Sequence, residues 1–299
     1  MLKIENLEKS YGSFKVLKGL NMTVNKGDVY GFLGKNGCGK STTMNIVSNI
    51  ITKDSGAVRF GKEDIKIGYL PESPAMFDYM NGYEYLEYIA ACCKYKGDVK
   101  VRINEVLTLT GMLEGGKRRI KGYSRGMNQR LGIAATIFNN PDLLILDEPT
   151  SALDPQGRAE VMNIITELAK TGTTIILCTH ILSDVERVAN RIGIVRDGVM
   201  AVEGDIEEIR KSFEEKSKKF VLTVFGDSSQ VINAVAEITD GNFAYDEKTG
   251  EITIPVLPSE NEEAKAKQIL EALLQKRIVP DSFALSRKSL EEIYLETIG

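Results

Sequence analysis

The sequence predicts a layered α/β domain over its first two thirds, followed by a small α+β domain. Three short runs, "GDVYGFLG", "DLLILDEP" and "TTIILCTH", are apolar with little polar alternation. Such runs are typical of central parallel strands that are covered on both faces. Segments with helical spacing of apolar residues separate them, which favours an α/β architecture.

The composition is that of an ordinary soluble globular protein, with 42% hydrophobic and 27% charged residues among 299. The net charge of −4 gives no general reason to expect nucleic acid or an anionic membrane as a partner. The four cysteines show neither metal-ligand spacing nor a paired framework, so we expect reduced cytosolic thiols. No apolar run approaches the ~18 residues of a membrane-spanning helix, so any such helix must come from another chain.

The first domain is expected to cover residues 1–210. The N-terminal "MLKIENLEKSYG" alternates polar and apolar residues like a strand and unlike a signal peptide. Residues of about 74–135, including "MFDYMNGYEYLEYIAACCKYKG" and "VRINEVLTLTGM", have helical periodicity and predict a mostly helical subdomain. The charge-rich residues 211–218 are interpreted as a solvated linker to the second domain.

The second domain, residues 219–299, is expected to follow the order β-α-β-β-α-β of a ferredoxin-like fold. "KFVLTVFG" is a strand, "SSQVINAVAEI" a helix, and "NFAYDEKTGEITIPVL" a hairpin that turns near Thr249 and Gly250. Ser259 with Glu262 three places later forms a capping-box pattern that would open the next helix. The strand "DSFALS" and the helix "SLEEIYLETIG" complete the order.

A glycine-rich segment, "GKNGCGKST", follows the first apolar strand and precedes a helical pattern. It fits the phosphate-loop pattern G-x-x-x-x-G-K-[ST]. Glycines let the backbone amides surround phosphates, and the helix N-terminus adds its positive dipole. We expect Lys40 to reach the β- and γ-phosphates and Ser41 to ligate Mg²⁺. The predicted nucleotide-binding residues are Gly34, Lys35, Asn36, Gly37, Cys38, Gly39, Lys40, Ser41 and Thr42.

An acidic pair ends the second apolar strand, in "LLILDE". Asp147 is the expected Mg²⁺ ligand, through water, and Glu148 is placed to orient or deprotonate an attacking water. With the phosphate loop, this pair predicts a P-loop nucleotide hydrolase but leaves its class open.

Two further strings narrow the class. "YSRGMNQR" resembles the signature segment of the ATP-binding-cassette (ABC) family, and "LDEPTSALDP" is a highly specific string of the same family. The resemblance covers residues 1 to about 210. It implies an ABC cassette with a RecA-like α/β core, an antiparallel β subdomain and a helical subdomain. It also implies the binding and hydrolysis of ATP with Mg²⁺.

In that family two cassettes pair head to tail, and each ATP lies between one phosphate loop and the other subunit's signature. The resemblance implies that Ser124 and the Gly126 amide meet the γ-phosphate from the opposite subunit. It places Asp154 on a loop at the dimer interface, and it makes Tyr11, in "KSYG", the aromatic residue that stacks on adenine.

Two departures from the family pattern mark a branch. The usual L-S-G-G-Q reads Y-S-R-G-M, so that Arg125 adds a cation whose role the sequence does not define. Glu72, in "IGYLPES", replaces the glutamine that ligates Mg²⁺ and links the nucleotide to the membrane partner. A carboxylate keeps the oxygen ligand but adds negative charge near phosphates. Both features resemble the drug-, sodium- and lantibiotic-type exporter ATPases, and the C-terminal "SLEEIYLETIG" resembles their endings.

His180 is the only histidine and ends the strand "TIILCTH". Open α/β sheets bind ligands at the carboxyl ends of their strands, which places this imidazole beside the phosphate loop. In the resembled family the position belongs to the switch histidine that contacts the γ-phosphate and the attacking water. With Glu148 as the base, His180 is expected to stabilise and orient rather than to take the proton.

The leading hypothesis is the ATP-hydrolysing subunit of a membrane exporter on the cytoplasmic face of the cell membrane. Its partners would be integral-membrane permease subunits and a second, identical cassette, held in part by the C-terminal domain. Permease coupling helices would dock near Glu72 and in a groove formed by Phe77, Tyr79 and Met80, although core packing would also explain these three.

Two alternatives remain open in the sequence. A soluble ABC ATPase acting on ribosomes or DNA would usually carry two fused cassettes or coiled-coil insertions, which this chain lacks. A nucleotide-binding regulator that does not hydrolyse is disfavoured because Lys40, Asp147, Glu148 and His180 are all intact. The basic "GKRRIKGYSRG" lacks interleaved aromatics and lies in an acidic protein, so no nucleic-acid partner is expected.

Overall fold

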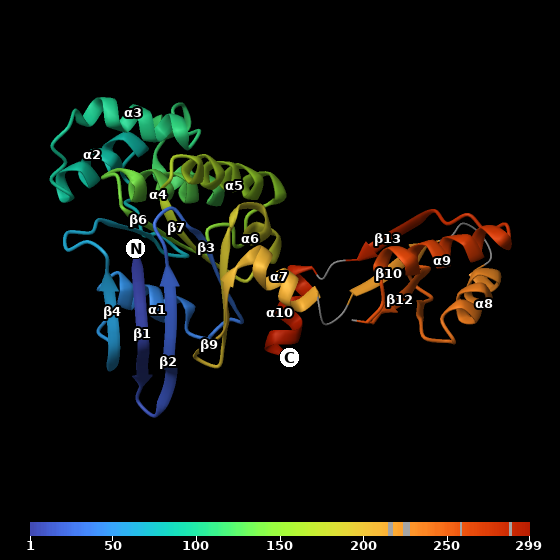
Figure 1. Ribbon diagram of the computed structural model, residues 1–299. Helices are drawn as coiled ribbons and strands as arrows, with labels where there is room; N and C mark the ends of the chain where they lie inside the picture. The colour runs from blue at the N-terminus through green and yellow to red at the C-terminus, as the bar shows by residue number, and fades with distance from the viewer. Residues whose placement is uncertain (215–217, 224–227, 258, 287–288) are drawn as a thin grey trace. The chain divides into compact units, whose positions relative to one another are not determined.

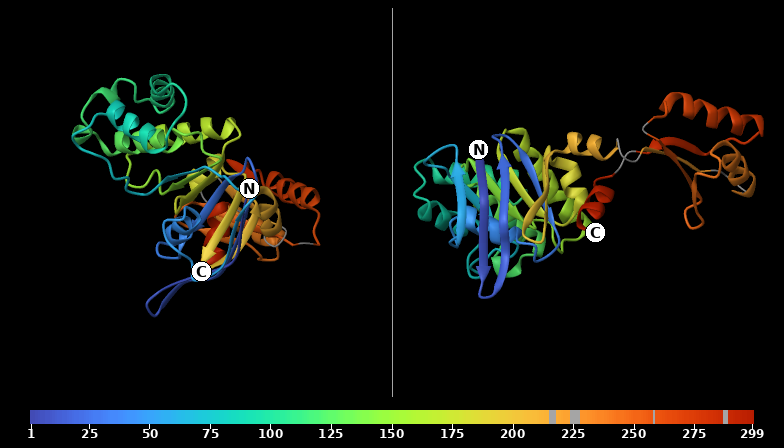
Figure 2. Two further views of the ribbon diagram at one scale, coloured as in Figure 1. Left: turned by 90° about the vertical axis from the view of Figure 1, so that its left-hand side faces the viewer. Right: turned by 60° about the horizontal axis from the view of Figure 1, so that its bottom comes forward.

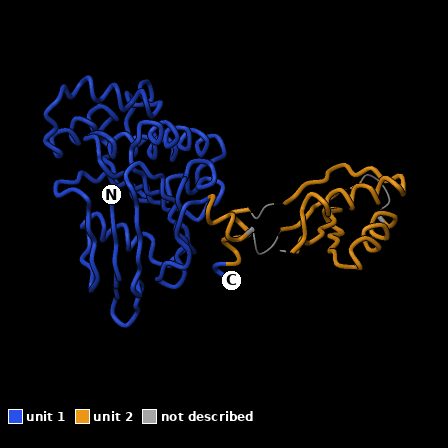
Figure 3. The backbone as a smooth tube through the Cα atoms, viewed as in Figure 1, with its two compact units in different colours: residues 1–206, 297–299 blue, residues 207–296 orange. Residues whose placement is uncertain are grey.

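The computed structural model describes residues 1–214, 218–223, 228–257, 259–286 and 289–299 (Figure 1). The chain divides into two compact units, coloured separately in Figure 3: residues 1–206 with 297–299, and residues 207–296. Helix α7 (Ile206–Glu214) and strand β10 (Lys218–Thr223) occupy both ends of the segment interpreted as a linker, and residues 215–217 lie outside the described residues.

A six-stranded sheet forms the centre of the first unit, in the order β5-β6-β7-β3-β8-β9. Strands β5, β6, β7, β3 and β8 are parallel, and β9 is antiparallel to β8. Every residue of β3, β6 and β7 is buried, which confirms the interpretation of the three apolar runs. The bounds are β3 Val29–Gly34, β5 Ile67–Leu70, β6 Leu143–Asp147, β7 Thr174–Thr179, β8 Arg191–Arg196 and β9 Val199–Asp205.

A second, antiparallel sheet in the order β2-β1-β4 covers the phosphate-loop region from one side. Its strands are β1 Leu2–Tyr11, β2 Phe14–Val24 and β4 Ser55–Phe60. Leu17 and Leu20 of β2 share one apolar core with Phe32 of β3 and Met44 of the helix α1 (Lys40–Val47). This common core fixes β3 and α1, and therefore the loop between them, against the antiparallel sheet.

The region expected to be helical contains three helices: α2 Gly82–Cys92, α3 Val99–Leu109 and α4 Arg125–Ile137. They lie together, away from the β1–β2–β4 sheet, in Figure 1 and in the left-hand view of Figure 2. Asn81 and Glu84 form a reciprocal capping box that starts α2, and the Asp98 side chain caps α3. Two further helices follow the strands that lead to the acidic pair and to His180. They are α5 Pro155–Lys170 after β6 and α6 Leu182–Val188 after β7.

The second unit has the predicted element order β-α-β-β-α-β. Its four strands are antiparallel in the order β11-β12-β10-β13, the arrangement of a ferredoxin-like fold. The predicted hairpin is confirmed, since Gly250 takes φ +71° and its N–H donates to the Asp246 carbonyl over 2.8 Å. The remaining elements are α8 Ser228–Ile238, β11 Ala244–Asp246, β12 Glu251–Val256, α9 Glu262–Gln275, β13 Ser282–Ser286 and α10 Leu290–Ile298.

The predicted start of α9 at Ser259 is wrong. Asn261 is the N-cap, and its side-chain oxygen accepts from the Ala264 N–H over 2.9 Å. Asn ranks with Ser as an N-cap, and here it stands directly before the first helical residue, Glu262. The preceding Glu260 accepts from the Leu257 N–H over 2.6 Å and thereby holds the chain in a turn. Within the described residues, no helix combines the length and apolarity that crossing a bilayer requires.

Replacing Asn261 by alanine tests the position of this cap. We expect N261A to lower the free energy of unfolding by about 1 kcal/mol, because the Ala264 N–H loses its acceptor. The matched S259A should change it by less than about 0.5 kcal/mol. Urea unfolding followed by circular dichroism measures both, and equal losses in the two variants would contradict the assignment.

Candidate functional site

The loop that joins β3 to α1 depends on glycine at defined positions. Gly37 and Gly39 take φ +80° and +108°, which L side chains rarely adopt, and Gly39 is the N-cap of α1. A Cβ on Gly34 would lie 2.5 Å from the Cys38 Sγ and 2.8 Å from the Val195 carbonyl oxygen. The loop is therefore held in a tight turn, and it leads directly into the N-terminus of α1, where a helix dipole favours an anion.

Lys40 is the first residue of α1, and its side chain is buried. Its Nζ donates to the Gly34 carbonyl over 2.7 Å and to the Lys35 carbonyl over 3.3 Å. The same ammonium lies 3.8 Å from Glu148 Oε1. Lys40 is thus folded back along its own loop, where two backbone oxygens accept hydrogen bonds from its ammonium.

Glu148 and His180 meet at the carboxyl edge of the parallel sheet. The neighbouring strands β6 and β7 are in register with Asp147 opposite Cys178, so the residues after both strands are adjacent. The His180 Nδ1 lies 3.0 Å from each carboxylate oxygen of Glu148, and the Thr179 hydroxyl donates to Glu148 Oε2 over 3.2 Å.

Glu148 itself is strained, with φ +48° in the left-handed region. Its N–H donates to the Cys178 carbonyl over 2.8 Å, which fixes this conformation. The carboxylate is nearly buried, whereas the imidazole that it contacts is about half exposed.

Asp147 is buried at the end of β6. Burial is the main reason that its pKa is raised, and the charges of Glu148 and Glu72 raise it further, while the Ser41 hydrogen bond and Lys40 lower it. The Tyr69 hydroxyl donates to Asp147 Oδ2 over 3.4 Å. The other oxygen, Oδ1, is buried without a hydrogen-bond partner.

An orphaned carboxylate oxygen beside a serine hydroxyl fits a hard cation such as Mg²⁺, which binds through one or two protein oxygens, water and phosphates. Among the described residues there is no group of three or more His, Cys, Asp or Glu side chains that would hold a metal ion without such help.

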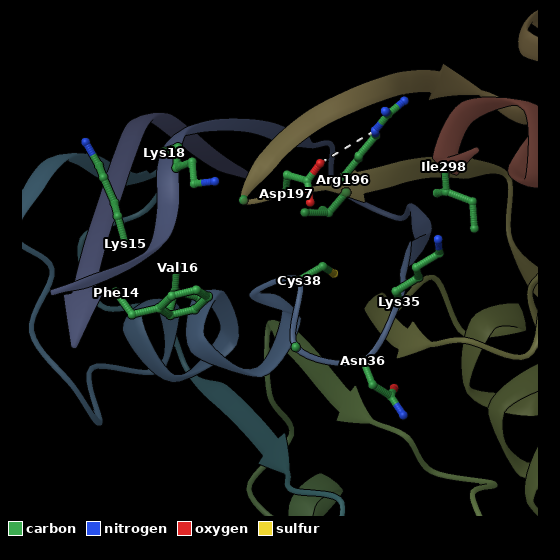
Figure 4. Close-up of a pocket in the computed structure, with 13 residues that line it drawn as sticks. Phe14, Lys15, Val16, Lys18, Lys35, Asn36, Cys38, Arg196, Asp197 and Ile298 are labelled. Atoms are coloured by element: carbon green, nitrogen blue, oxygen red, sulfur yellow. Dashed lines mark ion pairs between the residues drawn. The ribbon is translucent and has the colours of Figure 1, made fainter. Parts of the chain in front are cut away.

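Several of the predicted residues line one cavity of about 550 Å³, whereas Asp147 and His180 are not among its lining residues. It is lined by the phosphate loop, the start of α1, the predicted metal ligand Glu72 and the predicted base Glu148. A second cavity, of about 440 Å³, shares Asn36 and Gly37 of the same loop with the first and also includes Lys35 and Cys38 (Figure 4). Burial raises the pKa of the Cys38 thiol, so this side chain is neutral at physiological pH.

Two apolar residues that the sequence analysis did not select, Phe14 and Val16, line both cavities (Figure 4 shows them in the second). Tyr11, the predicted adenine platform, lines neither; it is 52% exposed and lies opposite Phe14 in the β1–β2 pairing. The stacking role of Tyr11 remains a prediction, and Phe14 is the aromatic side chain that borders the phosphate loop. The sequence could have indicated Phe14 by its position just after the "SYG" turn, at the start of the strand that pairs with β1.

Three predicted residues lie elsewhere. Ser124, Gly126 and Asp154 line a separate cavity of about 370 Å³ between the N-termini of α4 and α5. Ser124 caps α4 by accepting from the Met127 N–H, and Asp154 caps α5 by accepting from the Gly157 N–H. The exposed Arg125 lines the same cavity. Within one chain the structure therefore does not join the signature residues to the phosphate loop.

Comparison with known proteins identifies the family. A family model described as "ABC transporter" matches residues 17–151. The uncharacterized ABC transporter ATP-binding protein YxlF of Bacillus subtilis (strain 168) is 31% identical over 303 residues, covering 100% of this chain and 99% of the relative. The chain belongs to the ABC transporter ATP-binding proteins. It is therefore an ABC ATPase, an enzyme that binds and hydrolyses ATP.

Two further proteins similar to this ABC ATPase refine the comparison. The lantibiotic transport ATP-binding protein SrtF of Streptococcus pyogenes is 40% identical over 69% of this chain and 92% of its own length, which confirms the resemblance to the drug and lantibiotic branch. The ATP-binding cassette MJ0796, solved as a dimer in a post-hydrolysis state with ADP and Pi, superposes with a TM-score of 0.62 at 26% identity, over 69% of this chain and 99% of that chain. The predicted ABC cassette fold is confirmed.

The negative charges of Asp142, directly before β6, and Asp147, the last residue of β6, should have opposite effects on the stability of the fold. The pKa of Asp147 is raised mainly by burial, so its ionisation destabilises the nucleotide-free fold once the pH exceeds the unfolded pKa. The pKa of Asp142 is lowered, first by the hydrogen bond from the Lys66 N–H, so its charge stabilises the fold above the unfolded pKa.

We therefore expect D147N to raise the Tm at pH 7 without nucleotide and D142N to lower it, by about 2–4 °C for each 1 kcal/mol. The D147N difference should shrink as the pH falls toward 4 through the raised pKa of Asp147, whereas the D142N difference should persist to pH 4, because the lowered pKa of Asp142 keeps it ionised in the fold. Differential scanning fluorimetry across pH 4–8 measures this, and shifts of the same sign for both variants would contradict it.

Proposed function

We propose that the chain is the ATPase subunit of an exporter for antibiotic-like molecules, working at the cytoplasmic face of the membrane with permease subunits and a second, identical cassette. The observation that carries the hydrolytic part is the Glu148–His180 contact of 3.0 Å, beside a buried lysine and a phosphate-loop cavity. The similarity to a lantibiotic transport protein supports the export part.

The phosphates of ATP would enter the cavity of about 550 Å³ along the loop backbone. The N–H groups of the loop and the start of α1 would donate to the phosphate oxygens. Lys40 would exchange its contacts with the Gly34 and Lys35 carbonyls for the β- and γ-phosphate oxygens, a rearrangement within its present reach. Phe14 and Val16, together with the predicted Tyr11, would provide apolar and aromatic surface for the adenine ring of ATP.

Asp147, Ser41 and Glu72 would hold Mg²⁺, with Asp147 contributing through water. The support is the unpartnered Asp147 Oδ1 and the carboxylate of Glu72 on the cavity wall. Bound there, the ion would neutralise the charge of the phosphates.

Glu148 would act as the general base. Its carboxylate borders the cavity, where it can accept the proton of the attacking water as the water oxygen forms the bond to the γ-phosphorus and the bond to ADP breaks. His180 and Thr179 hold that carboxylate by hydrogen bonds, so His180 orients the base and faces the γ-phosphate with its exposed edge.

A second cassette would complete the site. Ser124, the Gly126 amide and Arg125 stand at the N-terminus of α4, where an anion is favoured, yet they line a cavity separate from the phosphate loop of the same chain. In a head-to-tail pair they would meet the γ-phosphate bound to the partner. Arg125 would add a cation there, and the Asp154 loop would lie at the interface.

The permease would dock on exposed aromatic side chains of the helical region. Phe77 and Tyr79 are 38% and 66% exposed, although core packing was the competing explanation for them. Their ring centroids lie 5.7 Å apart, and Phe77 also contacts Tyr88 over 5.2 Å. Met80 is partly buried, and its backbone oxygen accepts from the Ile120 N–H over 2.8 Å. The comparisons favour neither a ribosomal nor a DNA target.

Replacing Glu148 by glutamine tests the assigned base. We expect E148Q to lower kcat by about 10²–10⁴-fold, because the amide cannot accept the proton, while ATP still binds. ATP should then hold the variant as a dimer, which size-exclusion chromatography with light scattering detects. The control E63Q changes an exposed glutamate and should retain wild-type turnover. Fast turnover by E148Q would exclude this role.

Purification from detergent-solubilised membranes tests the transporter assignment. We expect a permease to copurify with the chain, whereas recovery only with ribosomes would refute the proposal. Y79A should reduce copurification at least several-fold with unchanged basal ATPase activity. V101A, which trims another exposed apolar side chain of the helical region (54% exposed), should leave copurification unchanged.

A further inference from the structure

One buried charge near the site has no part in the mechanism above. Asp184, on α6, is only 3% exposed. Its Oδ2 accepts from the buried Thr150 hydroxyl over 2.5 Å, and its Oδ1 accepts from Arg158 Nε over 2.8 Å. A second guanidinium nitrogen of Arg158 lies 2.7 Å from the same oxygen and donates to the Ser183 hydroxyl over 2.6 Å. We call Thr150, Asp184 and Arg158 the clamp.

The clamp joins the segments that carry the two hydrolytic side chains. Thr150 lies two residues after Glu148, on the loop between β6 and α5, and Asp184 lies four residues after His180. The loop needs an external tie, because both Glu148 and Ala152 occupy the left-handed region, at φ +48° and +52°. Such conformations persist only where the surroundings impose them.

Arg158 extends the clamp to the predicted interface. Its N–H donates to the Asp154 carbonyl over 2.9 Å in the first turn of α5, while its guanidinium pairs with Asp184. Asp154 and Ala152 line the cavity that also holds Ser124 and Gly126. The clamp is therefore a continuous hydrogen-bonded connection from that cavity to the helix that follows His180.

Stability alone is a poor explanation for this arrangement. Removing a carboxylate from water costs several kcal/mol, and apolar residues of similar volume often stabilise a fold at least as well as a buried ion pair. Hydrogen bonds to a buried charge do, however, define the separation of the groups that they join. Here that separation sets the contact between Glu148 and His180, and a misplacement of about 1 Å can cost ~10²-fold in rate.

We propose that Asp184 is a positioning residue: through Thr150 and Arg158 it holds His180 in register with Glu148 and ties that register to the Asp154 loop. The link to a second cassette rests on the proposed function, whereas the positioning of His180 does not. A displacement of the Asp154 loop by a partner would then change the positions of Glu148 and His180 through the buried carboxylate of Asp184.

The chain's single histidine makes the test direct, because its imidazole nitrogens give one resolved set of NMR signals. In ¹⁵N-labelled full-length protein without nucleotide, we expect T150V and D184N to displace the His180 Nδ1 signal in the direction that E148Q displaces it. T150S, which keeps the hydroxyl, should restore the wild-type position. This readout requires no turnover.

D28N is the matched control. Asp28 is also a buried carboxylate, 6% exposed and 3.4 Å from an arginine, Arg191, but it precedes β3 at the opposite edge of the sheet. It should lower the Tm as D184N does and leave the His180 signal in place. An unmoved signal in folded T150V and D184N, or an equal displacement in D28N, would overturn the proposal.

Kinetics supply the second measurement. T150V and D184N should lower kcat about 10- to 100-fold with the Kd for ATP within about twofold of wild type, because the clamp contacts no part of the phosphate loop. The double variant should be no slower than the slower single variant, since both remove one contact. Losses that multiply, or a Kd that rises in step with the loss of kcat, would contradict the positioning role. Recovery of the chain only with ribosomes, together with a displaced His180 signal in the variants, would refute the proposed function alone.

Discussion

The parallel pairing of β7 with both β3 and β6 is the constraint on which the site depends. Parallel strands end at one edge, so the phosphate loop after β3, the acidic pair at the end of β6 and His180 after β7 meet there although they are far apart in sequence. The strands are buried along their whole length, and a shift of one residue would move every side chain to the opposite face and disrupt its close packing. The register that buries the core therefore also sets the distances at the site.

The carboxylates at this edge of the sheet outnumber the cations that could neutralise them. Glu148 and the exposed Glu72 line the cavity with Lys40, and the charges of all three act on the buried Asp147 beside it. Repulsion by the two glutamates contributes to the raised pKa of Asp147. Triphosphate adds more negative charge, so Lys40 alone cannot balance it, and a divalent cation is the natural complement. The backbone at Glu148 is also strained. Its left-handed conformation fixes the direction of the carboxylate before substrate binds.

Local signals in the sequence were sufficient for most of the fold and for the centre of the site. Patterns among neighbouring residues define the three apolar runs, the glycine-rich loop and the acidic pair, and all of them were identified from the sequence. Contacts between residues that are far apart in the chain and are brought together by strand pairing were not identified. Phe14 reaches the cavity because the β1–β2 hairpin places it opposite Tyr11 at the start of β2. Ser259 and Asn261 are equally good caps, and only the preceding turn at Glu260 decides between them.

Buried polar contacts show the same limit most clearly. Thr150 and Asp184 stand in strings where a threonine and an aspartate would pass as ordinary turn and helix residues, and 34 positions separate them. Their bond exists because β6 and β7 are neighbours and the segments that follow them must pack side by side. In the proposed head-to-tail pair, Ser124 and Gly126 would act on the partner's nucleotide, and the loop that carries Ala152 and Asp154 would connect them to Glu148. A carboxylate buried at that loop responds to small displacements more steeply than an apolar contact would, because Coulomb and hydrogen-bond energies are large and directional where water is excluded.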